Sequence, residues 1–243
     1  MSATGSVAAG VYAVGVGPGD PRLLTLRAVE VLAAADLVVA PRGSADSASV
    51  ALNIVRDRLG EHCEVVELEF PMAESGDERE RAWAQAAERL AGPADDGGVA
   101  VMITLGDVSL YSTWGYVAEV LRRAHGEVPV EIVPGVSSPF ACAATAGVPL
   151  AAGREPLLLW PAEPPADLGE LFALAPNVVF LKAGRHLDLL ADELQRLGKR
   201  AVAVRRCGMT DEAVAEDLRS LAEDREYFTT VLARSETTAG EDS

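Results

Sequence analysis

The chain has 243 residues, of which 49% are hydrophobic, so it is long enough for one large or two modest packed domains. Its 21 basic and 37 acidic residues give a formal charge of −16, which argues against nonspecific nucleic-acid binding. Three widely separated cysteines and three isolated histidines indicate neither a disulfide framework nor a metal site. The N-terminus lacks a basic segment leading into an apolar core, and acidic residues interrupt the apolar runs, so we expect a soluble cytoplasmic protein without membrane contacts.

Strand-like apolar runs alternate with helical patterns in the first half of the chain. This alternation predicts an α/β fold with a parallel sheet. Strands are expected at 11–14, 37–40, 63–70, 99–104 and 130–133. Helices are expected at 23–35, at 49–59, around Trp83 as far as a turn over 91–98, at 116–123 and at 140–146.

The character of the sequence changes around residues 147–153, where glycines and prolines gather. We therefore expect an N-terminal α/β domain over 1–149, a C-terminal α/β domain over 150–234 and a disordered tail over 235–243. The C-terminal half predicts strands at 157–160, 178–181, 201–204 and 227–232, with helices at 187–197 and 214–222.

The first informative segment is residues 15–20, GVGPGD, which follows the apolar run at 11–14. Glycines permit tight backbone turns and close approach of a ligand, so the segment predicts a small-molecule site. It partly matches the dinucleotide-binding fingerprint, but Asp20 replaces the small residue that helix packing needs there, and Pro21 departs further. Asp36, at the spacing of a ribose-binding carboxylate, stands at the entry to the next strand. NAD binding is therefore disfavoured.

Two further loops follow predicted strands and carry glycine with aspartate or serine. Residues 105–113, LGDVSLYST, join the strand at 99–104 to a helix, and residues 134–138, PGVSS, follow the strand at 130–133. Ligands of open parallel sheets bind at the carboxyl ends of the strands. The loops therefore predict one small-molecule site at this edge.

The order of these segments resembles the tetrapyrrole (corrin and porphyrin) methylases, S-adenosylmethionine-dependent enzymes of cobalamin and sirohaem synthesis. The resemblance covers nearly the whole chain and rests on GVGPGD at 15–20, GD at 106–107, VPGVSS at 133–138 and RCGMTDE at 206–212. It implies two α/β domains with the cofactor in the cleft between them, in a homodimer.

The resemblance also implies which residues contact S-adenosylmethionine, position by position. The expected contacts are Pro18, Leu105, Gly106, Asp107, Leu110, Ser137, Ser138, Lys182, Cys207 and Thr230. Relatives often have methionine in place of Lys182, so this side chain is expected to turn away and to leave backbone contacts.

Within the family, GPGDP at 17–21 and GDVSLYST at 106–113 resemble the members that methylate precorrin-2 at C-20, although Val108 replaces a more usual proline. This implies precorrin-2 as the tetrapyrrole substrate. Cobalt-factor II, uroporphyrinogen III and another ring position stay open as alternatives. A more distant relative methylates a protein side chain in diphthamide formation.

Methyl transfer from a sulfonium needs alignment of the two partners and no side-chain nucleophile. The acceptor carbon must lose a proton afterwards, and Asp107, Tyr111 and Glu131 are candidate bases beside water and the macrocycle's own nitrogens. No catalytic base is assigned, although Asp107 and Tyr111 are weak candidates.

The carboxylates of a tetrapyrrole suit arginine, whose planar fork binds them bidentately. Arg22 and Arg27 read first as helix-surface residues, and Tyr111 either lines the site or packs under its loop. The candidate substrate contacts are Gly19, Asp20, Arg42, Tyr111, Arg154 and Arg185. A hypothesis of another class is a regulatory α/β module that binds a nucleotide-like ligand without catalysis.

Overall fold

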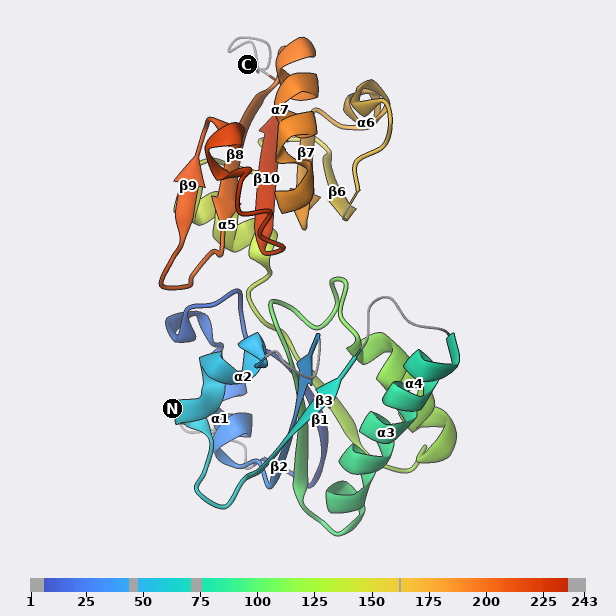
Figure 1. The fold of residues 1–243 in the computed structure, drawn as a ribbon. Coiled ribbons are helices and arrows are strands. Elements are labelled where there is room, and N and C mark those ends of the chain that lie inside the picture. Colours follow the sequence, from blue (N-terminus) through green and yellow to red (C-terminus); the bar gives the residue numbers. More distant parts are fainter. Residues whose placement is uncertain (1–6, 44–47, 71–75, 162, 236–243) are drawn as a thin grey trace. The chain divides into compact units, whose positions relative to one another are not determined.

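The computed structural model describes residues 7–43, 48–70, 76–161 and 163–235, which form an α/β protein with two sheets (Figure 1). The residue contacts divide the chain into two compact units, Met1–Ser137 and Ser138–Ser243. This division precedes the boundary that composition predicts at 149/150, because helix α5 (Ser138–Ala146) packs on the C-terminal sheet. The predicted tail over 235–243 lies outside the described residues, except for Ser235.

The N-terminal unit contains a five-stranded parallel sheet in the order β3-β2-β4-β1-β5. Of its three inner strands, β1 and β4 are buried at every residue, which explains their continuous apolar sequences. The strands are β1 (Gly10–Gly15), β2 (Leu37–Arg42), β3 (Glu64–Glu69), β4 (Val99–Thr104) and β5 (Val130–Val133).

Helices cover both faces of this sheet (Figure 1). One face packs against α1 (Leu26–Ala33) and α2 (Val50–Val55), and the other against α3 (Gly76–Asp95) and α4 (Trp114–Ala124). Short 3-10 turns, η1 (Pro21–Leu23) and η2 (Arg56–Arg58), precede α1 and follow α2.

Local sequence sets most of these helix ends. The hydroxyl of Thr25 accepts from Ala28 N and begins α1, as serine and threonine do at N-caps. The turn predicted over 91–98 is wrong in its first half, because α3 continues to Asp95. Ala91 and Ala94 are buried against the sheet, and this packing stabilises the last turn of α3 although Pro93 lies within it.

Neighbouring strands β1 and β4 send their connections to opposite faces of the sheet. The chain leaves β1 toward α1 and leaves β4 toward α4, which pack in different core clusters. Such a reversal opens a crevice between two loops, where open α/β sheets bind ligands. The sequence motifs at 15–20 and 105–113 follow these two strands.

The C-terminal unit has a mixed sheet in the order β6-β7-β10-β8-β9. Strands β6 and β7 are parallel, whereas β10 is antiparallel to β7 and β8, and β9 is antiparallel to β8. The strands are β6 (Leu157–Pro161), β7 (Asn177–Leu181), β8 (Arg200–Arg205), β9 (Ala213–Ala215) and β10 (Thr229–Arg234). The helical elements besides α5 are α6 (Leu168–Leu174), η3 (Ala183–His186), α7 (Leu187–Arg196) and η4 (Leu218–Leu221).

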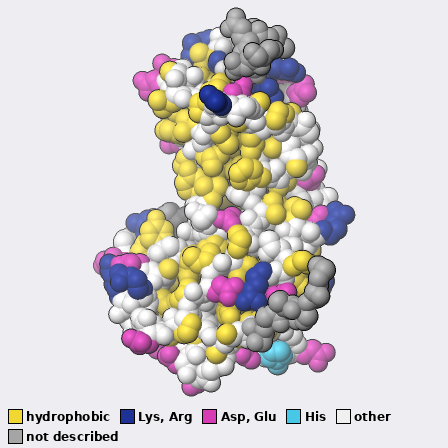
Figure 2. Space-filling view, turned by 180° about the vertical axis from the view of Figure 1, so that it is seen from behind, with side chains coloured by type: hydrophobic (Ala, Val, Ile, Leu, Met, Phe, Trp, Pro, Cys, Tyr) yellow, Lys and Arg dark blue, Asp and Glu magenta, His cyan; other side chains and the backbone are white. Residues whose placement is uncertain are grey.

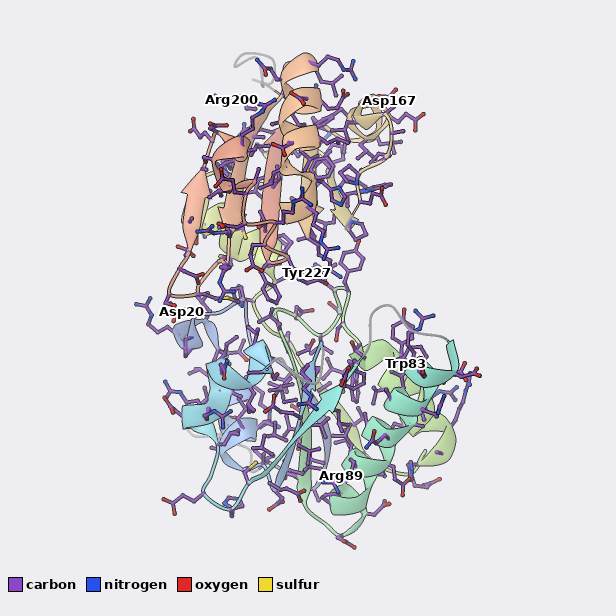
Figure 3. The ribbon with its side chains drawn as sticks, in the orientation of Figure 1. Asp20, Trp83, Arg89, Asp167, Arg200 and Tyr227 are labelled. Carbon is purple, nitrogen blue, oxygen red and sulfur yellow. The ribbon has the colours of Figure 1, made fainter. Side chains whose placement is uncertain are left out.

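The helix predicted at 214–222 is wrong. Val214 pairs with Val204 at the sheet edge, and the chain then turns into η4, which buries Leu218. Asp217 caps this turn by accepting a hydrogen bond from Arg219 N. The apolar residues of the segment therefore lie in a strand and a 3-10 turn. Helix α6, which the sequence pattern did not predict, begins at Asp167, whose carboxylate accepts from Gly169 N (Figure 3).

Hydrophobic side chains gather on the C-terminal unit in the view of Figure 2. A cavity of about 450 Å³ lies between the turn at 147–150 and the sheet, lined by apolar residues that include Leu157, Val202 and Leu232. In the part of the chain that the structure describes, no helix has both the length and the apolar character needed to span a bilayer.

Candidate functional site

Three loops meet at the carboxyl edge of the N-terminal sheet, beyond β1, β4 and β5. Gly17 and Gly106 form an isolated bridge, with Gly17 N donating to Gly106 O at 3.1 Å and Gly106 N donating to Gly17 O at 2.7 Å. Val16 N also donates to Thr104 O at 2.9 Å. Hydrogen-bonded backbone therefore joins the loops after β1 and β4, and we call this layer of main chain the glycine floor.

Glycine is required where these loops touch. A Cβ added at Gly135 would lie 2.2 Å from the carbonyl oxygen of Gly106, and one at Gly15 would lie 2.6 Å from Gly135 N. Both neighbours are backbone atoms and have little freedom to move. Gly17 and Gly106 have φ values of 77° and 74°, the left-handed region that glycine enters at no steric cost. The glycine motifs thus bring three segments of main chain together, and no side chain projects from the glycine positions.

Asp107 joins two of the loops. Its Oδ1 accepts from Ser109 N at 2.9 Å and from the Ser109 hydroxyl, while its Oδ2 accepts from Gly135 N at 2.9 Å. Burial alone raises the pKa of Asp107, but the bonds from Ser109 and Gly135 outweigh it and hold the pKa below its ordinary value. Asp107 is therefore an ionised clamp, and its oxygens are occupied as acceptors, which does not suit a proton acceptor.

The rest of the β4–α4 loop is held by the hydrogen bonds of Ser112 and by buried side chains. Ser112 Oγ accepts from Trp114 N at 3.1 Å and shares a 3.1 Å hydrogen bond with Thr104 Oγ1. Val108 and Trp114 are buried. Tyr111 stands out in this loop, because its φ of 51° is unfavourable for a side-chain-bearing residue while 51% of the residue is exposed. The structure thus favours an exposed Tyr111 over one packed under the loop.

Charged residues near this edge are mostly paired. Arg22 binds both carboxylate oxygens of Asp20 through Nε, at 3.0 and 2.9 Å, and its backbone N also donates to Asp20 (Figure 3). Arg27 binds Glu131 with two bonds of 2.8 Å. The hydrogen bonds from Arg27 lower the pKa of Glu131, so Glu131 is a poor candidate base. Arg42 ends β2 and is half-buried.

The expected contacts in the C-terminal unit gather at one edge of its sheet. Strand β10 is antiparallel to β7 and β8, so its start lies beside their ends. Lys182 follows β7, Cys207 follows β8, and Thr230 stands near the start of β10, opposite Val204. Ser138 begins α5, which packs against β8 and β10. Arg154 and Arg185 are exposed in a loop and in η3.

Lys182 has a left-handed backbone with φ of 58°. Its Nζ lies 5.3 Å from the centre of the Tyr227 ring, within cation–π range (Figure 3). The expectation that the side chain turns away from the donor stays a prediction. Gly184 follows at a tight approach, where a Cβ would lie 2.0 Å from Glu226 O.

Cys207 is buried beside α5. The Thr145 hydroxyl lies 3.7 Å from the Cys207 sulfur, and Cys142, three residues earlier on α5, is also buried. Cys142 and Thr145 were not predicted as neighbours of this site. Their i, i+3 spacing on a small-residue helix was the available signal, since it places both on one helix face.

Comparison with known proteins decides the family. The sequence model of the Tetrapyrrole (Corrin/Porphyrin) Methylases matches residues 10–222. The chain belongs to the tetrapyrrole methylase family.

Relatives and a solved structure of this family cover nearly the whole chain. A cobalt-precorrin-2 C(20)-methyltransferase of Salmonella typhimurium is 34% identical over 93% of this chain and 96% of its own length. A precorrin-2 C(20)-methyltransferase of Sinorhizobium is 29% identical over 90% and 92%. The structure of uroporphyrin-III C-methyl transferase from Thermus thermophilus, complexed with S-adenyl homocysteine, matches with a TM-score of 0.63 and 28% identity over 91% and 96%.

Family membership agrees with the argument against NAD. Asp36 precedes β2 and its carboxylate accepts from Val99 N at 2.8 Å, so it stands at the amino edge of the sheet, opposite the three loops. A ribose-binding carboxylate needs the carboxyl edge. In this tetrapyrrole methylase Asp36 instead ties the starts of two strands together.

Proposed function

We propose that this tetrapyrrole methylase transfers one methyl group from S-adenosylmethionine to C-20 of precorrin-2 in cobalamin biosynthesis. The observation that carries the proposal is the glycine floor at 15–17, 106 and 135 with its Asp107 clamp, in a chain whose full-length relatives are named for this reaction. The motif at 106–113 points to the same ring position.

The residues of the N-terminal edge suit a methyl donor. A ligand that lies against main chain needs positions without side chains, and the closest contacts at Gly15 and Gly135 leave no room for a Cβ. Leu105 and Leu110 are half-buried and supply apolar surface beside polar backbone, and Pro18 is buried next to them in the glycine-rich loop. The donor, when bound, supplies a methyl already activated on a sulfonium. The residues proposed to hold it are Pro18, Leu105, Gly106, Asp107, Leu110, Ser137, Ser138, Lys182, Cys207 and Thr230.

The chain's own part in the reaction is positioning. Alignment of two bound reactants can provide most of the acceleration for a displacement on an activated carbon. Asp107 fixes the loop, and Glu131 is held by Arg27, so neither is proposed as the base. Tyr111 stays a candidate for contact with the macrocycle or its departing proton.

The carboxylates of the substrate need cationic partners in an acidic chain. Arg42 ends β2 at the same sheet edge as the glycine floor and is the first candidate. The exposed Arg154 and Arg185 are the cationic candidates of the C-terminal unit. The uncharged or acidic residues Gly19, Asp20 and Tyr111 are further proposed substrate contacts in the N-terminal unit. Asp20 is held by Arg22, so this pair presents little net charge to an anionic substrate.

A second candidate is the same methylation on a cobalt-loaded substrate. It is favoured by the name of the Salmonella relative, which specifies cobalt-precorrin-2. In this case the metal belongs to the macrocycle. Cobalt-factor II and other ring positions of a tetrapyrrole are the remaining alternatives within the family.

We further infer that two copies of the chain form a cytoplasmic homodimer. Family resemblance motivates the pairing, and the cavity beside β6 and β8, lined by apolar residues together with Arg200, Glu216 and Arg234, offers surface for it. Light scattering on the purified protein tests it: a particle of twice the chain mass is expected, and a monomer at micromolar concentration contradicts it.

Turnover with isotope-labelled donor tests the activity. Precorrin-2 incubated anaerobically with the enzyme and methyl-labelled S-adenosylmethionine should become heavier by one labelled methyl, located at C-20 by NMR. A parallel reaction with the cobalt-loaded substrate ranks the two acceptors by kcat/KM. Donor binding without a labelled product from any tetrapyrrole would instead favour the regulatory module.

A further inference from the structure

The loop after β8, residues 206–212, carries Cys207, but the proposed function gives no part to its charged residues. Cys207 lies between two residues with a left-handed backbone, Arg206 with φ of 49° and Gly208 with φ of 76°. Glycine adopts this conformation freely, whereas a residue with a Cβ is strained in it. An arginine at position 206 therefore needs contacts that hold it there.

The Arg206 guanidinium joins its own loop to the segment that precedes β10. Its Nε donates to Asp211 Oδ1 at 2.6 Å, and its Nη1 donates to Glu226 Oε2 at 3.4 Å. The side chains of Arg206 and Glu226 are 30% and 26% exposed, so solvent screens this bond less than it screens an ordinary surface ion pair. The side chain thus bridges two segments that are about fifteen residues apart in the sequence.

Glu226 in turn orders the start of β10. Its Oε1 accepts from Phe228 N at 3.2 Å, and its carbonyl oxygen accepts from the Thr229 hydroxyl at 2.7 Å. Arg206 N donates to Phe228 O at 2.8 Å, so the backbone and the side chain of Arg206 hold the same segment. Thr230, a proposed donor contact, is the next residue of β10.

Two further hydrogen bonds close the loop around Cys207. Glu212 Oε2 accepts from Gly208 N at 2.6 Å, and Met209 N donates to Arg206 O at 2.9 Å. The loop is therefore closed on itself, and Arg206 connects the closed loop to the beginning of β10. Cys207 and Thr230 keep a fixed relation only while this connection holds.

We propose that Arg206 is a positioning residue of the methyl-donor site, which fixes Cys207 relative to Thr230 by bridging Asp211 and Glu226. The proposal rests on the proposed function, because Cys207 and Thr230 are donor contacts only there. Arginine suits this task because its planar guanidinium presents several donors in fixed directions, whereas lysine carries a point charge on a flexible chain.

Arg206→Gly separates positioning from backbone strain. Glycine accepts the left-handed conformation but lacks the guanidinium, so the melting temperature should change by less than about 4 °C. In calorimetry with S-adenosylhomocysteine, Kd should rise by about fivefold or more at unchanged stoichiometry. A lower stoichiometry at wild-type Kd would instead indicate partial unfolding, and either this result or unchanged binding overturns the proposal. Arg206→Lys, which keeps the charge, should bind with intermediate affinity.

The partner carboxylate tests the bridge by a double-mutant cycle. Glu226→Gln should weaken binding less than Arg206→Gly does, and the double variant should bind no more weakly than Arg206→Gly alone. Losses that add up would mean that the two side chains act separately, contrary to the proposal.

Arg219→Ala is the matched control, because Arg219 binds Asp192 and so also joins two segments of this unit, η4 and α7. It should leave Kd for S-adenosylhomocysteine within about twofold of wild type. A loss equal to that of Arg206→Gly would show that any broken ion pair in this unit weakens binding, and Arg206 would have no special role.

Amide hydrogen exchange without ligand tests the bridge independently of the proposed function. Exchange over 207–212 and 226–229 should be faster in Arg206→Gly than in the wild type, and exchange over α7 should be unchanged. If the wild-type protein fails to bind S-adenosylhomocysteine, the proposed function and the donor part of this inference are both wrong, while faster exchange still upholds the bridge. Unchanged exchange overturns the bridge whatever the wild type binds.

Discussion

The two units differ in how they build the sheet edges that carry the proposed donor contacts. The N-terminal edge consists of backbone. Main-chain atoms of neighbouring loops occupy the space that a Cβ would need at its glycines, and the Asp107 carboxylate holds two of these loops together. The C-terminal edge relies more on side chains, namely Lys182 against Tyr227 and Cys207 against α5, although its backbone also comes close at Gly184 and Glu226. Packed backbone has no rotamer with which to absorb an added atom, whereas side chains repack. Substitutions at the glycines of the N-terminal edge should therefore be felt far more strongly than substitutions of Lys182 or Cys207.

Gly135→Ala should have the largest effect. The added methyl would lie 2.2 Å from the Gly106 carbonyl oxygen and 2.6 Å from the Gly15 carbonyl carbon, so one of three loops must move. We expect a loss of about 3 kcal/mol in unfolding free energy and loss of donor binding, measured by urea denaturation and by calorimetry with S-adenosylhomocysteine.

Gly115→Ala is the matched control, because its methyl meets no described atom within 4 Å and the residue lies inside α4. It should stabilise the protein by up to about 1 kcal/mol, the usual helix preference for alanine over glycine. Equal effects at the two positions would remove the argument for a backbone-built edge.

Asp107→Ala should come next, because it releases the acceptor of three hydrogen bonds and leaves Gly135 N without its partner. We expect donor affinity to fall by about tenfold or more, which is about 1.4 kcal/mol. Asp107→Asn separates the contribution of hydrogen bonding from that of the negative charge, because the amide retains one acceptor oxygen. This variant should bind the donor with intermediate affinity. Unchanged binding in both variants would mean that the clamp does not position the donor.

The pH dependence of the clamp has a definite sign. The folded-state pKa of Asp107 lies below its ordinary value. A depressed carboxyl pKa contributes stability above the unfolded value of about 4 and loses it as pH falls through the folded value. Donor affinity of the wild-type protein should therefore show no Asp107 titration between about pH 5 and pH 8. A step in this window that Asp107→Asn abolishes would contradict an ionised clamp.

Tyr111→Gly separates activity from stability. Glycine removes the strain of the left-handed backbone, which stabilises the folded state by about 1 kcal/mol. It also increases the conformational entropy of the unfolded chain, which offsets a similar amount. Stability should thus change by less than about 1 kcal/mol, while KM for the tetrapyrrole rises if the exposed ring contacts it. Arg225→Gly, with φ of 47°, matches the backbone change in an exposed C-terminal loop and should leave the kinetics unaltered.

Local sequence patterns predicted the loops but not how they meet. GVGPGD and the later GD motif indicated turns after buried strands, and both turns are found there. Contact between Gly15 and Gly135 depends on the strand order β4-β1-β5, which pairs segments far apart in the chain and follows from long-range packing. The helix prediction over 214–222 was wrong for a related reason. The apolar spacing favoured a helix, but pairing of Val214 with Val204 at the edge of the sheet decided the structure. Thr145 and Cys207 likewise meet only through tertiary structure.

Glu131→Gln should have the smallest effect and tests the paired charges of the N-terminal unit. Arg27 and Glu131 are bound by two 2.8 Å hydrogen bonds but are 33% and 43% exposed, so solvent screens the pair. The amide still accepts one bond, and we expect a loss below about 1 kcal/mol with turnover within about twofold of wild type. Because Arg27 already lowers the pKa of Glu131, a catalytic base here would have to work against its own partner. A large fall in kcat at unchanged thermal stability would show that Glu131 takes the proton after all, and side-chain chemistry would then join the backbone at the N-terminal edge.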